Sequence, residues 1–319
     1  MTADRASFFS KSLKSSQLAT RLWRVEGREG GIDRAEARTD QLAVEEPLEI
    51  RLIWNGEPRT VAVTMRTPGA DAELAVGFLY AEGIVQDRGA IRRAGPCLEP
   101  PDIRDTGGGG ACANIVEVEV EGPESGAEPD WKTLERHFYA TSACGVCGKA
   151  GLESLALKVP EPLPPGPRLA PEVLRSLPET LRRSQGLFEA TGGLHAAGLF
   201  DASGRLLALR EDVGRHNALD KLLGWAFLEG RLPLHDHAVL VSGRSSYEIL
   251  QKCLMAGVPV VCAVSAPSSL AVELAGRFGL TLIGFLRGDR FNVYTGVERV
   301  ELPQGVVSHA ERCGLPIAL

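Results

Sequence analysis

The sequence predicts an α/β protein with two domains: a larger C-terminal α/β domain on a mostly parallel sheet, and a smaller N-terminal α+β domain. In the C-terminal part, near-continuous apolar strand patterns alternate with helical patterns, as in parallel sheets covered on both faces. In the N-terminal part, a hairpin, a helix and an alternating strand follow one another. Seven prolines between Pro160 and Pro178 separate the two patterns.

Five segments follow from these patterns. We expect a flexible N-terminal extension at 1–45 and the N-terminal α+β domain at 46–140. A cysteine-containing loop and a proline-rich linker occupy 141–180, the C-terminal domain 181–302 and a tail 303–319.

In the N-terminal domain, two β-rich runs flank Asn55-Gly56, a strong signal for a hairpin. Asp71 is expected to cap a helix whose apolar periodicity stops near Gly83. Residues Ile115–Val120 alternate apolar and acidic side chains, so this strand is expected to have one face in water.

In the C-terminal domain, a hairpin is expected to turn at Ser203-Gly204, followed by a helix over Asn217–Leu228. Strands and helices then alternate in the order HAVLVSG, SSYEILQKCLMAG, VPVVCAVSA, SSLAVELAGRFG and LTLIGFL. Cys253 falls in one of these helices and Cys262 in an apolar strand, so both are expected to be buried packing residues.

Composition excludes several classes of protein. The net charge of −6 gives no general attraction to nucleic acid or to anionic membranes, so an anion site must be local. No apolar run reaches the length of a membrane span. An odd number of cysteines, seven, and the lack of a signal peptide predict a cytoplasmic protein, although the basic first 24 residues leave a transit peptide as an alternative.

The segment TSACGVCGK carries Cys144 and Cys147 among small residues that leave both sulfurs uncrowded. The thiolate is the reactive form of cysteine, and CxxC pairs often have a lowered pKa. The pair suits dithiol–disulfide exchange, half of a metal site, or sulfur carriage as a persulfide; the alternative is two small residues in a glycine-rich turn.

Zinc and thioredoxin-like roles fit the sequence less well. A structural zinc site needs about four ligands, and only one CxxC pair is present, so we predict no metal. His235 and His237 precede a strand and are expected to be solvated. A thioredoxin-like pair would open a helix directly after a strand, whereas Cys144 and Cys147 precede the proline-rich segment.

Three loops follow the three apolar strands of the C-terminal domain: VSGRSS, VSAPSS and GFLRGDR. Ligands of open α/β sheets bind at the carboxyl ends of the strands. Arg287 and Arg290 are therefore candidates to hold phosphate groups, with Arg244, Ser245 and Ser246 as weaker candidates. Taken one at a time, serines before helices are ordinary caps.

The segment EDVGRHNALDK is dense in polar residues. His216 has an unperturbed pKa near neutrality, so it could move protons or only order the loop. Asn217 could cap the following helix, and Asp212 with Arg215 could form a surface ion pair.

Taken together, several of these motifs resemble the FdhD/NarQ family, the sulfur-carrier proteins needed for formate dehydrogenase activity. The resemblance runs from about residue 46 to 300 through TPGADAELAVGFLYAEGI, TSACGVCGK, EDVGRHNALDK, SGRSSYEILQK, SAPSSLAVELA and GFLRGDRFNVYTG, in that order. It implies a larger domain similar to cytidine deaminase without that enzyme's zinc motif, and a homodimer.

The resemblance also implies a function. A cysteine desulfurase would pass sulfur to Cys144 as a persulfide, with Cys147 as its partner, in a sulfurtransferase reaction. The acceptor would be the molybdenum bis(molybdopterin guanine dinucleotide) cofactor of formate dehydrogenase, which a guanine nucleotide could mimic. The family's cofactor-binding stretch falls on Phe285, Leu286, Arg287, Gly288, Asp289 and Arg290. A chaperone that binds the cofactor without covalent chemistry is the alternative, and a CxxC redox or zinc module is a third.

Overall fold

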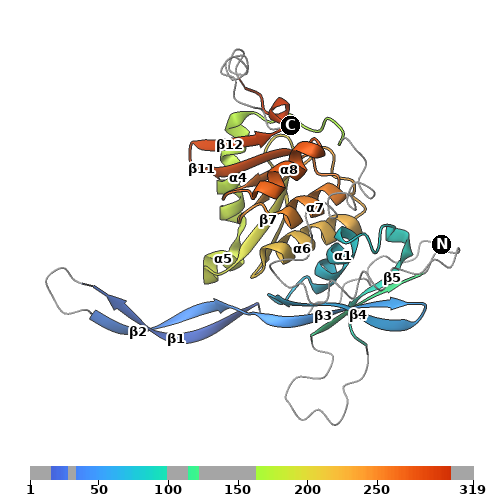
Figure 1. Cartoon of the computed structure of the whole chain (residues 1–319). Coiled ribbons are helices and arrows are strands. Elements are labelled where there is room, and N and C mark those ends of the chain that lie inside the picture. Colours follow the sequence, from blue (N-terminus) through green and yellow to red (C-terminus); the bar gives the residue numbers. More distant parts are fainter. Residues whose placement is uncertain (1–15, 28–33, 99–113, 122–162, 303–319) are drawn as a thin grey trace, which may run out of the picture.

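A computed structural model describes residues 16–27, 34–98, 114–121 and 163–302. These residues form a mixed α/β structure with a two-stranded, a four-stranded and a six-stranded sheet (Figure 1). Cys144 and Cys147 lie outside the described residues, as do the linker before residue 163 and the tail after residue 302. Within the described residues, no helix combines the length and apolar character that a membrane crossing requires.

The four-stranded sheet has the order β4-β3-β6-β5, with β3 and β6 parallel and the other neighbours antiparallel. Its strands are β3 (Glu46–Trp54), β4 (Glu57–Arg66), β5 (Ile91–Pro96) and β6 (Ile115–Val120), and a short 3-10 helix, η2 (Arg88–Ala90), precedes β5. The predicted hairpin is confirmed, because Asn55 and Gly56 both have the positive φ that a tight β3–β4 turn requires.

Helix α1 (Asp71–Ala81) covers one face of this sheet, and its leucines share a core with Leu48, Ile50 and Leu52 of β3. Two details differ from the prediction. The helix is capped by Ala70, while the carboxylate of Asp71 pairs with the buried Arg66 at 3.0 Å.

The acidic face of β6 also differs from the prediction that it lies in water. Glu117 is only 4% exposed because Arg93 of the neighbouring strand β5 pairs with its carboxylate. A cross-strand ion pair therefore covers Glu117, whereas the Glu119 side chain on the same face is 43% exposed, so the predicted solvated face is present only in part.

The six-stranded sheet has the order β12-β11-β10-β9-β7-β8. Its strands are β7 (His195–Phe200), β8 (Leu206–Asp212), β9 (Ala238–Val241), β10 (Val260–Ala263), β11 (Thr281–Arg287) and β12 (Arg290–Thr295). The sheet is mixed rather than mostly parallel: only β9, β10 and β11 run parallel, because β7–β8 and β11–β12 are hairpins and β7 is antiparallel to β9. The further likeness to cytidine deaminase stays a prediction.

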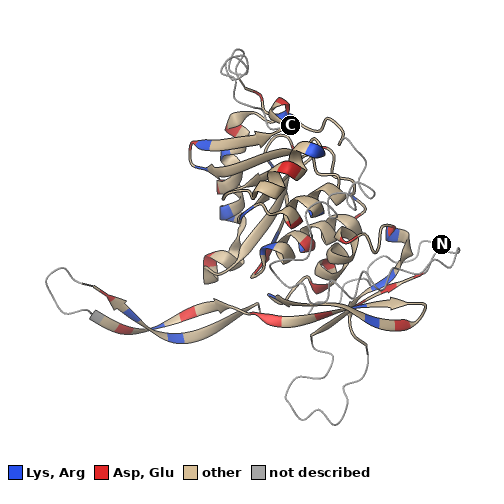
Figure 2. Ribbon diagram, in the orientation of Figure 1, with Lys and Arg blue, Asp and Glu red and all other residues tan. Residues whose placement is uncertain are grey.

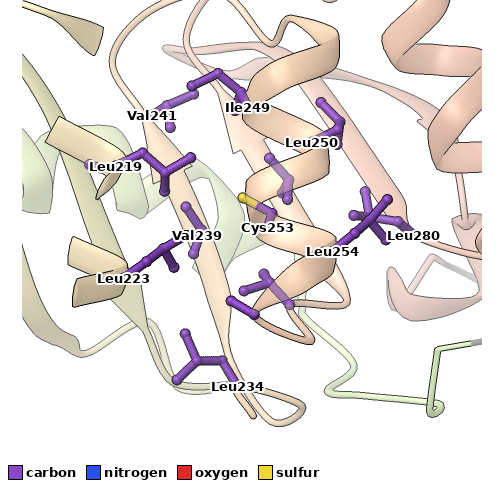
Figure 3. Close-up of a cluster of buried hydrophobic side chains, with 14 of the residues drawn as sticks. Leu219, Leu223, Leu234, Val239, Val241, Ile249, Leu250, Cys253, Leu254 and Leu280 are labelled. Atoms are coloured by element: carbon purple, nitrogen blue, oxygen red, sulfur yellow. The ribbon is translucent and has the colours of Figure 1, made fainter. Parts of the chain in front are cut away.

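Helices cover both faces of the large sheet. On one face lie α6 (Arg215–Leu228), α7 (Tyr247–Met255) and α8 (Ser269–Arg277), and on the other lies α4 (Pro171–Ser184). Figure 3 shows Cys253 among leucine and valine side chains between α7, α6 and the sheet. Cys253 and Cys262 are fully buried, as predicted, and burial raises the pKa of Cys262 to about 12. A short helix, α5 (Gly186–Thr191), follows α4, and η3 (Val297–Arg299) follows β12.

Two segments contain structure that the sequence analysis did not predict. Residues expected to be a flexible extension form β1 (Gln17–Glu26) and β2 (Arg34–Ala43), a ten-residue antiparallel ladder. Part of the expected linker is α4, where Pro171 occupies a first-turn position that needs no N–H donor. The helix continues through Pro178 because its leucines recur at helical spacing and are buried: Leu174, Leu177 and Leu181.

The small and large sheets are joined through a close crossing of α1 and α6. A Cβ atom on Gly77 would lie 1.9 Å from the carbonyl oxygen of Asp220, and one on Gly224 would lie 1.8 Å from that of Glu73. The two helix backbones therefore touch. Phe227 of α6 completes the apolar core beneath the small sheet.

Candidate functional site: the carboxyl edge of the large sheet

The loops after β9, β10 and β11 lie side by side, as the sequence predicts. The backbone N–H of Ser245 donates to Ala266 O at 3.3 Å, and the N–H of Ser268 donates to Ser245 O at 3.0 Å. The third loop joins them through the N–H of Phe285, which donates to Ser265 O at 3.1 Å. We call residues 242–246, 264–268 and 285–290 the carboxyl edge.

The turn from β11 to β12 divides the six predicted cofactor-binding residues. Leu286 is fully buried in the core beneath the sheet, and Phe285 is half-buried with a φ of 52°. The exposed residues of the turn are Arg287, Gly288, Asp289 and Arg290. The Arg287 guanidinium lies 5.9 Å from the centre of the Phe285 ring. Side-chain contact with a ligand therefore falls to the arginines and to Asp289.

The serines of the first two loops behave differently. Ser268 caps α8 in the ordinary way, because its hydroxyl accepts from Ala271 N–H at 3.2 Å. Ser246 occupies the same position before α7, but its hydroxyl makes no capping bond. Ser245 is fully buried, and its hydroxyl has no hydrogen-bond partner in the described part of the chain. Buried polar groups rarely lack partners, so this hydroxyl retains unused hydrogen-bonding capacity.

Two histidines flank the first of these loops. His216 Nε2 lies 3.0 Å from Glu248 Oε2 and 3.3 Å from the Ser246 hydroxyl. His195 Nδ1 lies 3.5 Å from the hydroxyl of Ser242, which accepts from a backbone N–H of β7. His195 was missed in the sequence analysis. The feature that could have identified it is its position as the first residue of β7. Because β7 runs antiparallel to β9, the start of β7 lies beside the end of β9.

Arg215 lies near His195 and directly precedes His216 in the chain. A Cβ on Gly243 would lie 3.5 Å from His195 Nδ1 and 3.6 Å from Arg215 Cδ, so both side chains approach the glycine. Burial, with the charges of Arg215 and His216, lowers the pKa of His195, and Asp212 opposes the shift. The Nε of Arg215 is buried and has no partner among the described residues. This part of the carboxyl edge therefore presents a neutral imidazole beside an incompletely paired cation.

Asp212 has a structural role rather than the surface ion pair with Arg215 that the sequence analysis considered. It is fully buried, and its carboxylate lies 2.7 Å from Lys221 Nζ. It also accepts from Gly214 N–H at 2.8 Å and from Thr67 N–H at 3.1 Å. Asn217 donates to the same carboxylate and does not cap α6, whose cap is Gly214.

The described ends of the segment that carries Cys144 and Cys147 both lie toward the opposite, amino edge of the parallel strands. Leu163 donates its N–H to Phe278 O, just before β11 begins. Glu121 donates to Ala90 O, and the adjacent Arg88 reaches Leu228 O at the end of α6. About forty residues separate these ends, which is enough chain to span the length of the strands.

No group of three or more potential metal ligands occurs among the described residues. His235 and His237, which were expected to be solvated, are both half-buried, and burial lowers the pKa of His237.

Fold and edge together define a class: an α/β protein in which exposed arginines and the uncapped N-terminus of α7 lie on one sheet edge, an arrangement suited to phosphate groups. The chain belongs to the FdhD/NarQ family, whose model matches residues 43–301.

Proteins named sulfur carrier protein FdhD are similar over most of the chain. The one from Mycobacterium tuberculosis is 50% identical over 270 residues, covering 84% of this chain and 94% of the relative. The one from Streptomyces coelicolor is 48% identical over 281 residues, covering 88% and 94%. A crystal structure from Desulfotalea psychrophila, described as a candidate formate dehydrogenase accessory protein, is 26% identical with a TM-score of 0.62, covering 89% of this chain and 99% of that one.

Proposed function

We propose that this chain is a sulfur carrier that accepts sulfur from a cysteine desulfurase as a persulfide on Cys144. It delivers the sulfur to the molybdenum bis(molybdopterin guanine dinucleotide) cofactor of formate dehydrogenase, bound at the carboxyl edge. The observation that carries this proposal is that Arg244, Arg287 and Arg290, all exposed, lie on the first and third of three neighbouring loops at one edge of the sheet. The names of the relatives support the sulfur-carrying role.

The chemistry balances with the two cysteines alone. The thiolate of Cys147 attacks the Cys144 sulfur, the persulfide S–S bond breaks, and a disulfide forms between the cysteines. The terminal sulfur leaves with the bonding electron pair, at the oxidation level of sulfide. The thiolate is the nucleophile in this step, so the reaction slows as the solution becomes more acidic.

The edge fits the phosphates of a guanine dinucleotide. Arg287 and Arg290 would hold phosphate oxygens, and the unpartnered hydroxyl of Ser245 would donate a hydrogen bond to the same group. When bound, the cofactor supplies a metal that takes up the sulfur. The chain's part is to orient it and to bring Cys144 to it from segment ends near the opposite edge of the strands.

Covalent sulfur carriage is tested by intact mass. After incubation with a cysteine desulfurase and cysteine, the wild-type chain should gain the mass of one sulfur atom, and Cys144→Ala should not. Cys97→Ser is the matched control, since it removes a different cysteine, which is half-buried, and should leave the gain unchanged. An unmodified wild-type chain would refute persulfide formation.

Phosphate binding is tested separately with GDP as the probe. Arg287→Ala should weaken GDP binding about tenfold to a hundredfold, because a charge-assisted hydrogen bond is lost. Arg183→Ala, on an exposed face of α4, is the control and should change nothing. Equal affinity of all three proteins would remove GDP-type ligands from this edge.

A cofactor-binding chaperone without covalent chemistry is the second candidate, because the described edge is assembled without any cysteine. Cells that rely on Cys144→Ala distinguish the two. Full formate dehydrogenase activity would favour the chaperone, and its loss, with GDP binding intact, would favour sulfur transfer.

A further inference from the structure

The loops before α7 and α8 are similar in sequence, and each places a serine at the helix cap. Ser246 has φ −92° and ψ 170°, and Ser268 has φ −84° and ψ 160°, so the two backbones are alike. Ser268 accepts a hydrogen bond from the N–H of Ala271, three residues on, whereas Ser246 makes no capping bond to its own helix. The difference therefore lies in what each hydroxyl contacts.

The imidazole of His216 engages the first turn of α7. Its Nε2 lies 3.3 Å from the Ser246 hydroxyl and 3.0 Å from Glu248 Oε2. Helices α6 and α7 both carry acidic and basic residues (Figure 2), and the next pair between them joins Lys252 to Asp220. A carboxylate in a first turn is attracted by the free N–H groups there. One side chain of α6 thus holds both groups of α7 that would otherwise occupy its N-terminus.

We propose that His216 is a positioning residue that keeps the N-terminus of α7 open for an oxyanion such as a phosphate group. The first N–H groups of a helix have no partner inside the helix, and they favour negative charge. Ser245, the residue before the cap, supports a ligand at this end. It is fully buried, and its hydroxyl has no hydrogen-bond partner within the described ranges.

The role of His216 rests on the proposed function, which places phosphate groups at the carboxyl edge. Without the imidazole, the Ser246 hydroxyl would accept from the N–H of Ile249, as Ser268 does at the equivalent position of α8. The freed carboxylate of Glu248 would stay near the same N–H groups and repel a phosphate. His216→Ala should therefore close this part of the edge and leave the arginines of the β11–β12 turn in place.

Hydrogen exchange of the full-length chain tests the open helix end without any ligand. In His216→Ala, the amide of Ile249 should exchange about fivefold more slowly than in the wild type, because the Ser246 hydroxyl then caps it. The amide of Ala271, which is already capped, should keep its rate. An Ile249 amide that exchanges equally fast in both proteins would overturn the role of His216.

Calorimetry with GDP measures the consequence for binding. His216→Ala should weaken GDP binding about fivefold, because the donors of the helix end are occupied and a carboxylate is released beside them. His216→Gln should retain most of the affinity, since an amide N–H can still donate to Glu248. His237→Ala is the matched control, because it removes a half-buried histidine before β9, at the opposite edge, and should change nothing.

A mutant cycle separates positioning from direct contact between His216 and the ligand. When Ser246→Ala and Glu248→Gln are already present, adding His216→Ala should weaken GDP binding less than about twofold, because neither side chain remains to close the helix end. An undiminished loss in that background would overturn the proposal. GDP binding that depends on Arg287 but not on His216 would overturn this role alone, whereas a wild-type chain that does not bind GDP would also refute phosphate binding at the edge.

Discussion

The two ends of the polar network around α6 differ in how completely their buried groups are paired. At the junction with the small sheet, the Asp212 carboxylate contacts Lys221, Thr67 and Gly214. Lys252 pairs with the Asp220 carboxylate at 2.8 Å, although Asp220 Oδ1 makes no hydrogen bond in the described part of the chain. At the carboxyl edge, the Ser245 hydroxyl and Arg215 Nε are buried without partners in the described part of the chain.

This difference separates structural polar groups from groups available to a ligand. A buried charge is stable only when it is paired and hydrogen-bonded, and the junction meets that condition. Although burial opposes the charged form, the carboxylates of Asp220 and Glu82 raise the pKa of Lys252. The junction therefore holds the two sheets together, while the edge retains unsatisfied capacity where phosphate groups are proposed to bind.

The largest effect is expected when one member of the junction's ion pair is removed. Lys221→Met should lower the free energy of unfolding by about 3–5 kcal/mol, because it leaves the Asp212 carboxylate buried without its cation. Denaturant titration measures the change. Arg183→Met, which breaks an exposed pair with Glu179, should cost less than about 0.5 kcal/mol. If the two variants were equally stable, the junction would have no special role.

The helix crossing provides the next test. Gly224→Ala should destabilise the chain by roughly 3 kcal/mol, because the new Cβ would meet the Glu73 backbone and force α1 away from α6. Gly186→Ala places the same methyl group where no atom lies within 4 Å, so it should be close to neutral. Similar denaturation midpoints for the two variants would mean that the helices do not cross this closely.

Much of the fold could be predicted because local patterns specify it. The Asn55-Gly56 turn, the helix at 217–228 and the alternating strands and helices after residue 238 depend on turn chemistry and hydrophobic periodicity. The β1–β2 hairpin could not be predicted in this way, because its exposed faces carry no apolar alternation. Helix α4 was hidden by its prolines, and the direction of β7 depends on contacts between distant parts of the chain.

The site was predictable only in part for a similar reason. Loops that follow parallel strands meet at one edge by topology, so the loops that carry Arg244 and Arg287 lie on either side of the loop after β10. No sequence pattern distinguished Ser245, which lacks a partner, from Ser268, which caps a helix. The burial of Asp212 depends on Thr67, about 145 residues away, so its role could not be read locally.

A smaller effect should appear as a pH dependence at the edge. Burial and nearby cations lower the pKa of His195 in the folded chain, so the unfolded chain binds the proton more readily. The stability that this histidine contributes is present above about pH 6.5 and is lost as the pH falls through its folded pKa. His195→Gln should therefore lose less stability than the wild type between about pH 7.5 and pH 5.5, above the range of carboxylates. Parallel pH profiles would contradict this assignment.

The smallest effect on stability should come from Ser245→Ala, and it bears most directly on the difference between junction and edge. The Ser245 hydroxyl has no partner to lose, so removing it should change the free energy of unfolding by less than about 0.5 kcal/mol or raise it slightly. If the hydroxyl serves a bound phosphate, GDP affinity should nevertheless fall several-fold. Ser268→Ala should do the reverse, costing about 1 kcal/mol through the lost cap while leaving GDP binding unchanged. A Ser245→Ala chain that is clearly destabilised would mean that the hydroxyl belongs to the fold rather than to a ligand.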